Sequence, residues 1–245
     1  MNKPTFIILG AGRSGSTHLY NILRQHPEVF LTTPKEPSFF CRPFQVVKNP
    51  IDYFELYEKV SDEKIIGEAS HVYLSNPSSA KLLKTLFPTA KFLLILRNPA
   101  DRAHSLYDWM RRNGFEESET FEEALEAEDR RFSSSAFTSN PPQYLYNSLY
   151  YRSGLYGEQL QRYLALFPKE QFLVLKFEEF IKDRANQFKT VCRFLEIRED
   201  FTPEFDVGKN SGDKPAFAEQ TRASLLEKYQ PDLKILQSLS GVEFS

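Results

Sequence analysis

A short loop near the start of the chain combines glycines, hydroxyls and one cation in the pattern of a phosphate-binding site. It reads Gly10-Ala-Gly-Arg-Ser-Gly-Ser-Thr17 and directly follows the apolar stretch Phe6–Leu9. A strand, a turn of small residues and then a helix would aim backbone N–H groups and the positive end of the helix at one anion. The loop therefore predicts a site for a phosphate-bearing ligand.

The cation of this loop is displaced from the position that nucleoside triphosphatases use. Their pattern G-x-x-x-x-G-K-[ST] places a lysine directly after the second glycine, where it reaches the β- and γ-phosphates. Here Gly10 and Gly15 occupy the glycine positions and Thr17 the hydroxyl position, but Ser16 stands where the lysine is required. The positive charge lies inside the loop at Arg13. The ligand is therefore expected to differ from ATP with its magnesium.

A second candidate anion site is the segment Leu96-Arg-Asn-Pro-Ala-Asp-Arg-Ala-His-Ser-Leu-Tyr107. It follows an apolar strand at the edge where open α/β sheets bind ligands. In an ATPase this strand would be a candidate to end in an aspartate for magnesium, but here it ends in Arg97. Ser105 follows about two helical turns later and would face the same space, so that a guanidinium and a hydroxyl meet one anion. The alternative is a structural ion pair for Arg97 and a surface position for Ser105.

Apolar runs and helical stretches alternate along the chain and position these motifs. The alternation predicts a P-loop-type open parallel sheet flanked by helices, an α/β fold. A length of 245 residues without an internal repeat is consistent with a single domain over residues 1–245. The expected strands are 5–9, 28–31, 64–67, 91–97 and 171–176, and the expected helices include 16–25, 53–60, 78–87, 99–112 and 218–238.

Composition and charge exclude several classes of function. A net charge of −2 argues against a general nucleic-acid surface. Cys41 and Cys192 give neither a disulfide framework nor metal-ligand spacing, and the four histidines show no ligand pattern, so no metal is expected. The longest apolar run, Phe92–Leu96, is far too short to span a bilayer. With no room for a signal peptide before the first strand, we expect a cytoplasmic protein.

Two segments interrupt the alternation. Residues 115–131 are acidic and begin with the capping pattern Thr120-x-x-Glu123, which predicts a solvated helix. Residues 133–142 are rich in serine and proline and lack periodicity, which predicts a flexible connector, with a lid over the site as the alternative.

The two anion motifs together resemble the sulfotransferases that depend on 3′-phosphoadenosine 5′-phosphosulfate (PAPS), including the carbohydrate and tyrosylprotein branches. The patterns are G-x-x-[RK]-[ST]-G-[ST]-[ST] and R-[ND]-P-x-x-R-x-x-S, and the resemblance extends from Phe6 to about Pro215. It implies that Arg97 and Ser105 hold the 3′-phosphate of PAPS. It also implies that the 5′-phosphosulfate is held by Arg13, Ser14, Gly15, Ser16 and Thr17.

Three further features of the sequence are interpreted through this resemblance. The segment Lys35-Glu-Pro-Ser-Phe-Phe40 is similar to one in which a glutamate precedes two aromatic residues, which implies that Glu36 is the general base. Its alternatives are a simple pairing of Glu36 with Lys35, and Glu68 or His71 as the base. The loop 208–215 resembles one that closes over the nucleotide, through Ser211, Gly212 and Lys214, with Lys209 as a helper.

The chain departs from the heparan-type enzymes at Ala69, where they carry a lysine. The missing ammonium would help neutralise the transferring group or an acidic sugar, so its absence argues against a heparan-like acceptor. Arg13 stands where cytosolic members carry lysine, and an arginine stays protonated, so we expect it to stabilise charge on the leaving phosphate without donating a proton.

The predicted function is transfer of a sulfuryl group from PAPS to a hydroxyl or amine, with release of adenosine 3′,5′-bisphosphate (PAP) and without a metal. The acceptor is a small molecule, carbohydrate, lipid or peptide that the sequence does not identify. Two alternatives stay open. One is a P-loop kinase or other NTPase, and the other is a nucleotide-binding protein without catalytic activity.

Overall fold

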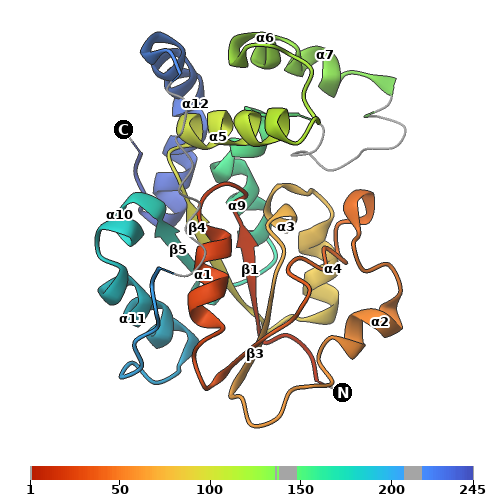
Figure 1. The fold of residues 1–245 in the computed structure, drawn as a ribbon, viewed down its shortest axis with the longest axis vertical. Helices are drawn as coiled ribbons and strands as arrows, with labels where there is room; N and C mark the ends of the chain where they lie inside the picture. The colour runs from red at the N-terminus through yellow and green to blue at the C-terminus, as the bar shows by residue number, and fades with distance from the viewer. Residues whose placement is uncertain (1, 136, 138–147, 207–216, 245) are drawn as a thin grey trace.

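A five-stranded parallel sheet forms the centre of the computed structural model, which describes residues 2–135, 137, 148–206 and 217–244 (Figure 1). The strand order is β2-β3-β1-β4-β5, and every neighbouring pair runs parallel. The predicted open parallel sheet flanked by helices is thus confirmed. The strands are β1 (Phe6–Gly10), β2 (Val29–Leu31), β3 (Ile65–Ala69), β4 (Lys91–Leu96) and β5 (Phe172–Lys176).

Both faces of the sheet are buried, because alternate side chains of the central strands enter two separate hydrophobic clusters. In β1, Ile7 and Leu9 belong to the larger cluster, whereas Phe6 and Ile8 belong to the smaller one. Burial on both faces explains why the strands appear in the sequence as continuous apolar runs.

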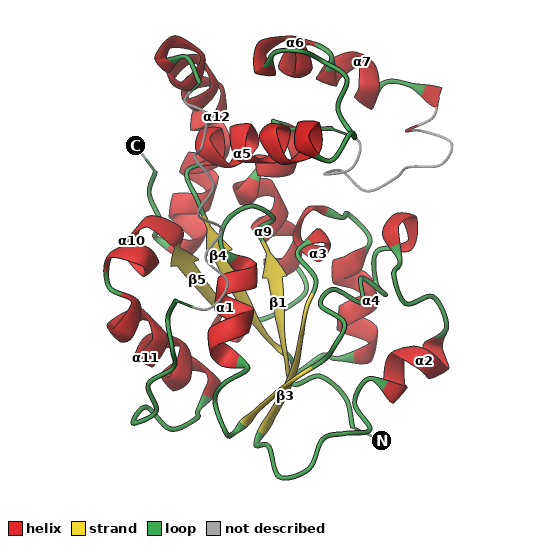
Figure 2. Cartoon of the chain, in the orientation of Figure 1, coloured by secondary structure: helices red, strands yellow, loops and turns green. Residues whose placement is uncertain are grey.

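Helices cover the two clusters; Figure 2 draws the helices in red and the strands in yellow. Helices α1, α10 and α11 contribute to the smaller cluster, and α3, α4, α5, α9 and α12 contribute to the larger one. Their bounds are α1 (Ser16–Leu23), α2 (Pro50–Glu55), α3 (Val72–Ser75), α4 (Ser79–Leu86), α5 (Pro99–Arg112), α6 (Phe121–Glu126), α7 (Glu128–Phe132), α9 (Tyr156–Leu164), α10 (Phe177–Lys182), α11 (Arg184–Leu195) and α12 (Glu219–Ser240).

Helix α2 differs from the expected helix at 53–60. The side chain of Asn49 accepts a hydrogen bond from the N–H of Ile51, and Pro50 occupies the first helical position. Proline is favourable there because the N–H it lacks has no intrahelical partner. The cap therefore starts the helix three residues earlier than its apolar periodicity indicates.

Helix α5 crosses the carboxyl edge of the sheet above the phosphate loop (Figure 1). Its start is fixed by the side chain of Asn98, which accepts from the N–H groups of Ala100 and Asp101. The fully buried Arg102 anchors the helix, since its guanidinium donates to Ser153 Oγ over 3.0 Å and to the carbonyl of Tyr150. The second arginine of the R-[ND]-P-x-x-R motif thus has a structural role.

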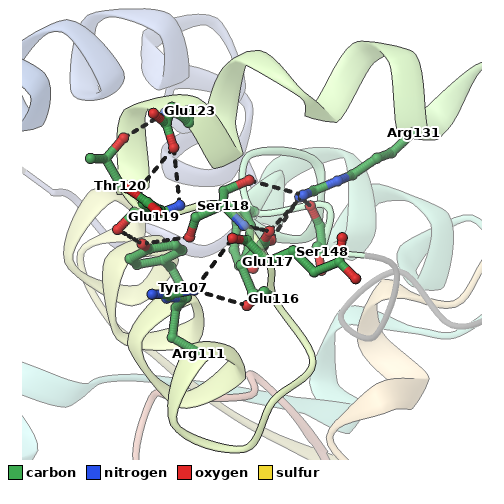
Figure 3. A network of polar contacts seen from close by, with 11 residues as sticks. Tyr107, Arg111, Glu116, Glu117, Ser118, Glu119, Thr120, Glu123, Arg131 and Ser148 are labelled. Atoms are coloured by element: carbon green, nitrogen blue, oxygen red, sulfur yellow. Dashed lines mark hydrogen bonds and ion pairs between the residues drawn. The ribbon is translucent and has the colours of Figure 1, made fainter.

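The acidic segment after α5 is not simply a solvated helix. The predicted capping box between Thr120 and Glu123 is present at the start of α6. However, Glu116 is buried, and Arg131 donates to both of its carboxylate oxygens over 2.8 and 2.7 Å (Figure 3). The hydroxyl of Tyr150 adds a third bond to Glu116 over 2.6 Å. This network ties the turn after α5 to α7 and to the segment before α9.

Two predicted loops lie outside the described residues, wholly or in large part. These are the connector at 133–142 and the late loop at 208–215, which carries Lys209, Ser211, Gly212 and Lys214. Within the described part of the chain, no helix is long and apolar enough to cross a lipid bilayer.

Candidate active site

The phosphate loop connects β1 to α1 in a conformation that requires glycine at Gly15. This residue has φ of 93° and forms the N-cap of α1. A Cβ at this position would lie 2.8 Å from Cδ2 of Phe177. Since glycine has no side chain to cap the helix, the first N–H groups of α1 are left for a ligand. Arg13 also adopts a left-handed conformation, with φ of 67°.

Arg13 is a partly buried cation without a counter-ion among the described residues. Its Nε is buried and has no hydrogen-bond partner within that part of the chain. Burial lowers the pKa of Arg13, and repulsion from Arg112 and Arg97 lowers it further, against the attraction of Asp108. Burying a charge without a partner is costly. The surroundings of Arg13 are therefore suited to a bound anion.

Arg97 follows the last residue of β4, and its guanidinium carbon lies 5.7 Å from the centroid of the Phe177 ring. No acidic side chain in the described ranges forms an ion pair with Arg97, so the alternative of a structural ion pair is not observed. Ser105 is half-buried in the second turn of α5. That Arg97 and Ser105 hold the same phosphate stays a prediction.

A cavity of about 150 Å³ lies between the phosphate loop and α5. It brings Arg13, Ser16 and Thr17 of the phosphate loop together with Glu36 and His71, two of the residues considered as the base. Ser14 is fully buried and its side chain does not line the cavity. The complete lining is Gly12, Arg13, Ser16, Thr17, Glu36, His71, Leu106, Trp109 and Met110.

Glu36 is held in the cavity wall by donors from two segments. Lys35 Nζ donates to Oε1 over 2.8 Å, the backbone N–H of His71 donates to Oε2 over 3.0 Å, and the imidazole Nδ1 of His71 contacts Oε1. The segment itself is tied to the end of β3, because the N–H of Ser38 donates to Ser70 Oγ over 3.0 Å. Glu36 therefore pairs with Lys35 and also lines the cavity, and its role as the general base stays a prediction.

The protonation state of Glu36 follows from these contacts. Burial raises the pKa of its carboxyl, but the attraction and hydrogen bonds of His71 and Lys35 outweigh burial and lower the pKa to about 2. The carboxylate is therefore ionised at neutral pH and has oxygen lone pairs that can accept a proton.

Glu68, the competing candidate for the base, lies in the core. It is fully buried and is not part of the cavity lining. The hydroxyl of Tyr57 donates to its Oε2 over 3.3 Å. Burial raises the pKa of Glu68 to about 7, although hydrogen bonds from Tyr73, Tyr53 and Tyr57 act in the opposite direction. A carboxyl in this position has no access to an acceptor in the cavity.

Two groups of residues in the site were not predicted as functional. Leu106, Trp109 and Met110 form the α5 side of the cavity. Their i, i+3, i+4 spacing is a detectable helix face, but the sequence does not tell whether that face covers core or ligand. Lys35 was considered only as a partner of Glu36, yet its Nζ also donates to Thr17 Oγ1 over 3.1 Å. That contact depends on the path of the loop, which leaves no sequence signal.

Comparison with known proteins agrees with this geometry. Residues 3–210 match the family described as the sulfotransferase domain. The chain belongs to the sulfotransferase family. The crystal structure of a sulfotransferase from Alicyclobacillus acidocaldarius superposes with a TM-score of 0.85 and 30% identity, covering 100% of this chain and 98% of that one.

Two curated relatives of this sulfotransferase are much longer proteins. The membrane-associated sulfotransferase kil1 of Dictyostelium discoideum is 36% identical over 118 residues, which cover 45% of this chain and 24% of the relative. The human bifunctional heparan sulfate N-deacetylase/N-sulfotransferase 2 is 28% identical over 208 residues, which cover 79% of this chain and 22% of the relative. The chain thus spans about a quarter or less of the length of these relatives.

Proposed function

We propose that this sulfotransferase moves a sulfuryl group from PAPS to a hydroxyl or amine of an acceptor and releases PAP. One observation carries the proposal. Arg13, a cation without an ion pair among the described residues, and the ionised carboxylate Glu36 line the same small cavity, beside the start of α1. A cation suits the leaving phosphate, and a carboxylate suits the proton that an acceptor must lose.

The residues present fit the donor PAPS. The phosphosulfate is anionic, and the loop offers uncapped N–H groups, the positive end of α1 and Arg13. Arg97, with Ser105, provides a second place for an anion at the carboxyl edge of the sheet, as the 3′-phosphate requires. The proposed contribution of Ser211, Gly212 and Lys214 rests on the family resemblance alone.

The proposed reaction is an in-line displacement at sulfur. A lone pair of the acceptor oxygen or nitrogen forms the new bond to sulfur, while the bond from sulfur to the donor phosphate breaks and its electron pair stays on the phosphate. Glu36 takes the acceptor proton. Arg13 faces the charge that grows on the phosphate and, because it remains protonated, stabilises that charge electrostatically.

The two other functions remain as alternatives with less support. A kinase or NTPase would need a lysine at the position of Ser16 and an acidic residue at the strand end in place of Arg97. A binding protein without catalytic activity would have no use for an ionised carboxylate on the cavity wall. The acceptor is proposed only as a hydroxyl or amine of a small molecule, carbohydrate, lipid or peptide. Ala69, which lacks the ammonium of heparan-type enzymes, argues against a heparan-like acceptor.

The direct test is transfer of labelled sulfate from PAPS across sugars, phenols, lipids and peptides, with a chelator present throughout. The Glu36→Gln variant serves as the control for non-enzymatic transfer. We expect labelled product and PAP in equal amounts with at least one acceptor. Tight PAP binding without transfer to any acceptor would favour the binding protein instead.

A further inference from the structure

Lys35 connects the phosphate loop to the proposed base. Its ammonium donates to Thr17 Oγ1 over 3.1 Å and to Glu36 Oε1 over 2.8 Å. The side chains of Lys35 and Glu36 are each only 13% exposed, so this pair is shielded from solvent in a way that surface ion pairs are not. Thr17 and Glu36 both line the cavity. The ammonium is therefore held between the residues proposed to bind the donor and the residue proposed to accept the proton.

The sequence lacks two ammonium groups that related patterns place near this edge of the sheet. The triphosphatase loop pattern has its lysine at the position of Ser16, and the heparan-type enzymes have theirs at the position of Ala69. Ser16 lines the cavity, and Ala69 is the last residue of β3. Lys35 follows β2, the strand next to β3 in the sheet, and so reaches the same edge from a neighbouring element.

The resting contacts of Glu36 leave it a weak base. A general base is most effective when its pKa lies near the working pH, whereas the pKa of Glu36 is about 2 because His71 and Lys35 overcome the effect of burial. One of the bonds from His71 comes from the backbone, which is fixed at the start of α3. Lys35 has a long flexible side chain and is the contact that can be exchanged.

We infer that Lys35 couples donor binding to activation of the base, an inference that rests on the proposed function. With PAPS in the loop, the ammonium turns from Glu36 to the sulfuryl oxygens beside Thr17. It then neutralises the group in transfer and leaves Glu36 free to accept the acceptor proton. Lys35 keeps its own protons throughout. The bonds formed and broken at sulfur, and the transfer of the acceptor proton to Glu36, are the same as in the proposed reaction.

A shift in pH dependence distinguishes this role from a merely structural one. The charged or titratable groups around Glu36 are Lys35 on its own segment, His71 after β3, Arg13 in the phosphate loop and Glu68 behind them in β3. Lys35 lowers the pKa of Glu36, so removing its charge must raise that pKa. The acid limb of kcat/KM for PAPS, which reports the free enzyme, then moves to higher pH.

The experiment compares Lys35→Gln and Lys35→Arg with Lys91→Gln. Lys91 is the matched control because it also forms an ion pair, over 2.7 Å with Glu196. It is the first residue of β4 and so lies away from the carboxyl edge of the sheet. For each protein, calorimetry without acceptor gives the ratio of the Kd values for PAP and PAPS, which isolates the sulfuryl group. Saturation kinetics over a range of pH give kcat and the acid limb, and thermal melts establish that each variant is folded.

We expect Lys35→Gln to lower the Kd ratio by roughly tenfold and kcat by about 10- to 100-fold, with PAP affinity kept within about threefold. The acid limb moves upward, Lys35→Arg restores part of kcat, and the control resembles wild type. An unchanged Kd ratio and acid limb would overturn the inference. If Lys35→Gln does not fold, Lys35→Met, which also removes the charge, is measured in its place with the same two readouts and the same expected changes. Failure of the wild type to transfer sulfate would instead contradict the proposed function.

Discussion

The backbone N–H of His71 donates to Glu36 Oε2 over 3.0 Å, and the imidazole Nδ1 of the same residue contacts Oε1. Glu36 follows β2 and His71 follows β3, which are neighbours in the sheet. Two parallel strands that end at one edge thus bring together residues 35 positions apart. Together with the bond from Lys35, these contacts orient the carboxylate, so the proposed base is positioned before any acceptor binds.

Glu36→Gln keeps the size of the side chain but cannot take a proton at neutral pH. We expect turnover at saturating PAPS to fall by roughly 10²- to 10⁴-fold, with PAP affinity within about a factor of three of wild type. Glu68→Gln should cost less, because Glu68 is fully buried outside the cavity.

The same assay separates the base from its neighbours. Near-wild-type turnover in Glu36→Gln, with activity abolished in His71→Ala or Glu68→Gln, would place the base on the third strand, β3, or at its end. All variants need the same acceptor at saturation, since a weakened acceptor complex would look like a lost base.

Arg13→Ala tests whether the loop cation acts in the transition state. Charge on the leaving phosphate grows only as sulfur departs, so we expect turnover to fall by about 10² to 10³. Rapid-quench measurement of a single turnover separates this effect from PAP release. A loss confined to PAPS affinity, with unchanged turnover at saturation, would make Arg13 a binding residue only.

The sequence predicts the main elements well where local signals decide them. Helix α5 begins and ends as expected, because Asn98 and Pro99 form a cap that acts locally. The strands are recognisable because both sheet faces are buried, as the alternation of Ile7 and Ile8 between two clusters shows.

What the sequence does not predict depends on contacts between distant segments. Glu116 belongs to a stretch that looks solvated, and only the arrival of Arg131 and Tyr150 makes its burial favourable. Lys35 and Trp109 join the site through the path of a loop and the height of a helix above the sheet. Neither quantity is encoded in local spacing.

Glu68 should make the stability of the protein fall as pH rises. Its pKa is about 7 when folded, against an ordinary value of 4.5, so the folded state holds the proton more tightly. The stabilisation that comes from this tighter proton binding is complete below pH 4.5 and is lost as pH rises through 7. Between pH 5 and 8 the loss amounts to about 2 to 3 kcal/mol in the free energy of unfolding.

Urea unfolding of wild type and Glu68→Gln at the two pH values measures this difference. The variant stays uncharged, so its stability relative to wild type should improve at pH 8. The same pH dependence of stability in the two proteins would contradict the role of Glu68.

Trp109 offers a spectroscopic reading of the acceptor side. It is the only tryptophan in the chain, and it lines the cavity from α5. An acceptor that is turned over should change its emission in the presence of PAP, because Trp109 lines the same cavity as Glu36, the proposed base. Trp109→Phe keeps an aromatic ring and removes the signal. If Trp109 emission does not change when a proven acceptor is added, acceptors bind outside this cavity.

The central claim concerns the ligand of the phosphate loop, and competition calorimetry tests it most directly. PAP should bind tightly and equally well with magnesium or with a chelator, and ATP with magnesium should compete poorly, because Ser16 and Arg97 replace the residues that a triphosphatase needs. Arg97→Ala should weaken PAP binding by roughly 2 to 3 kcal/mol. A preference for ATP with magnesium over PAP would contradict the account.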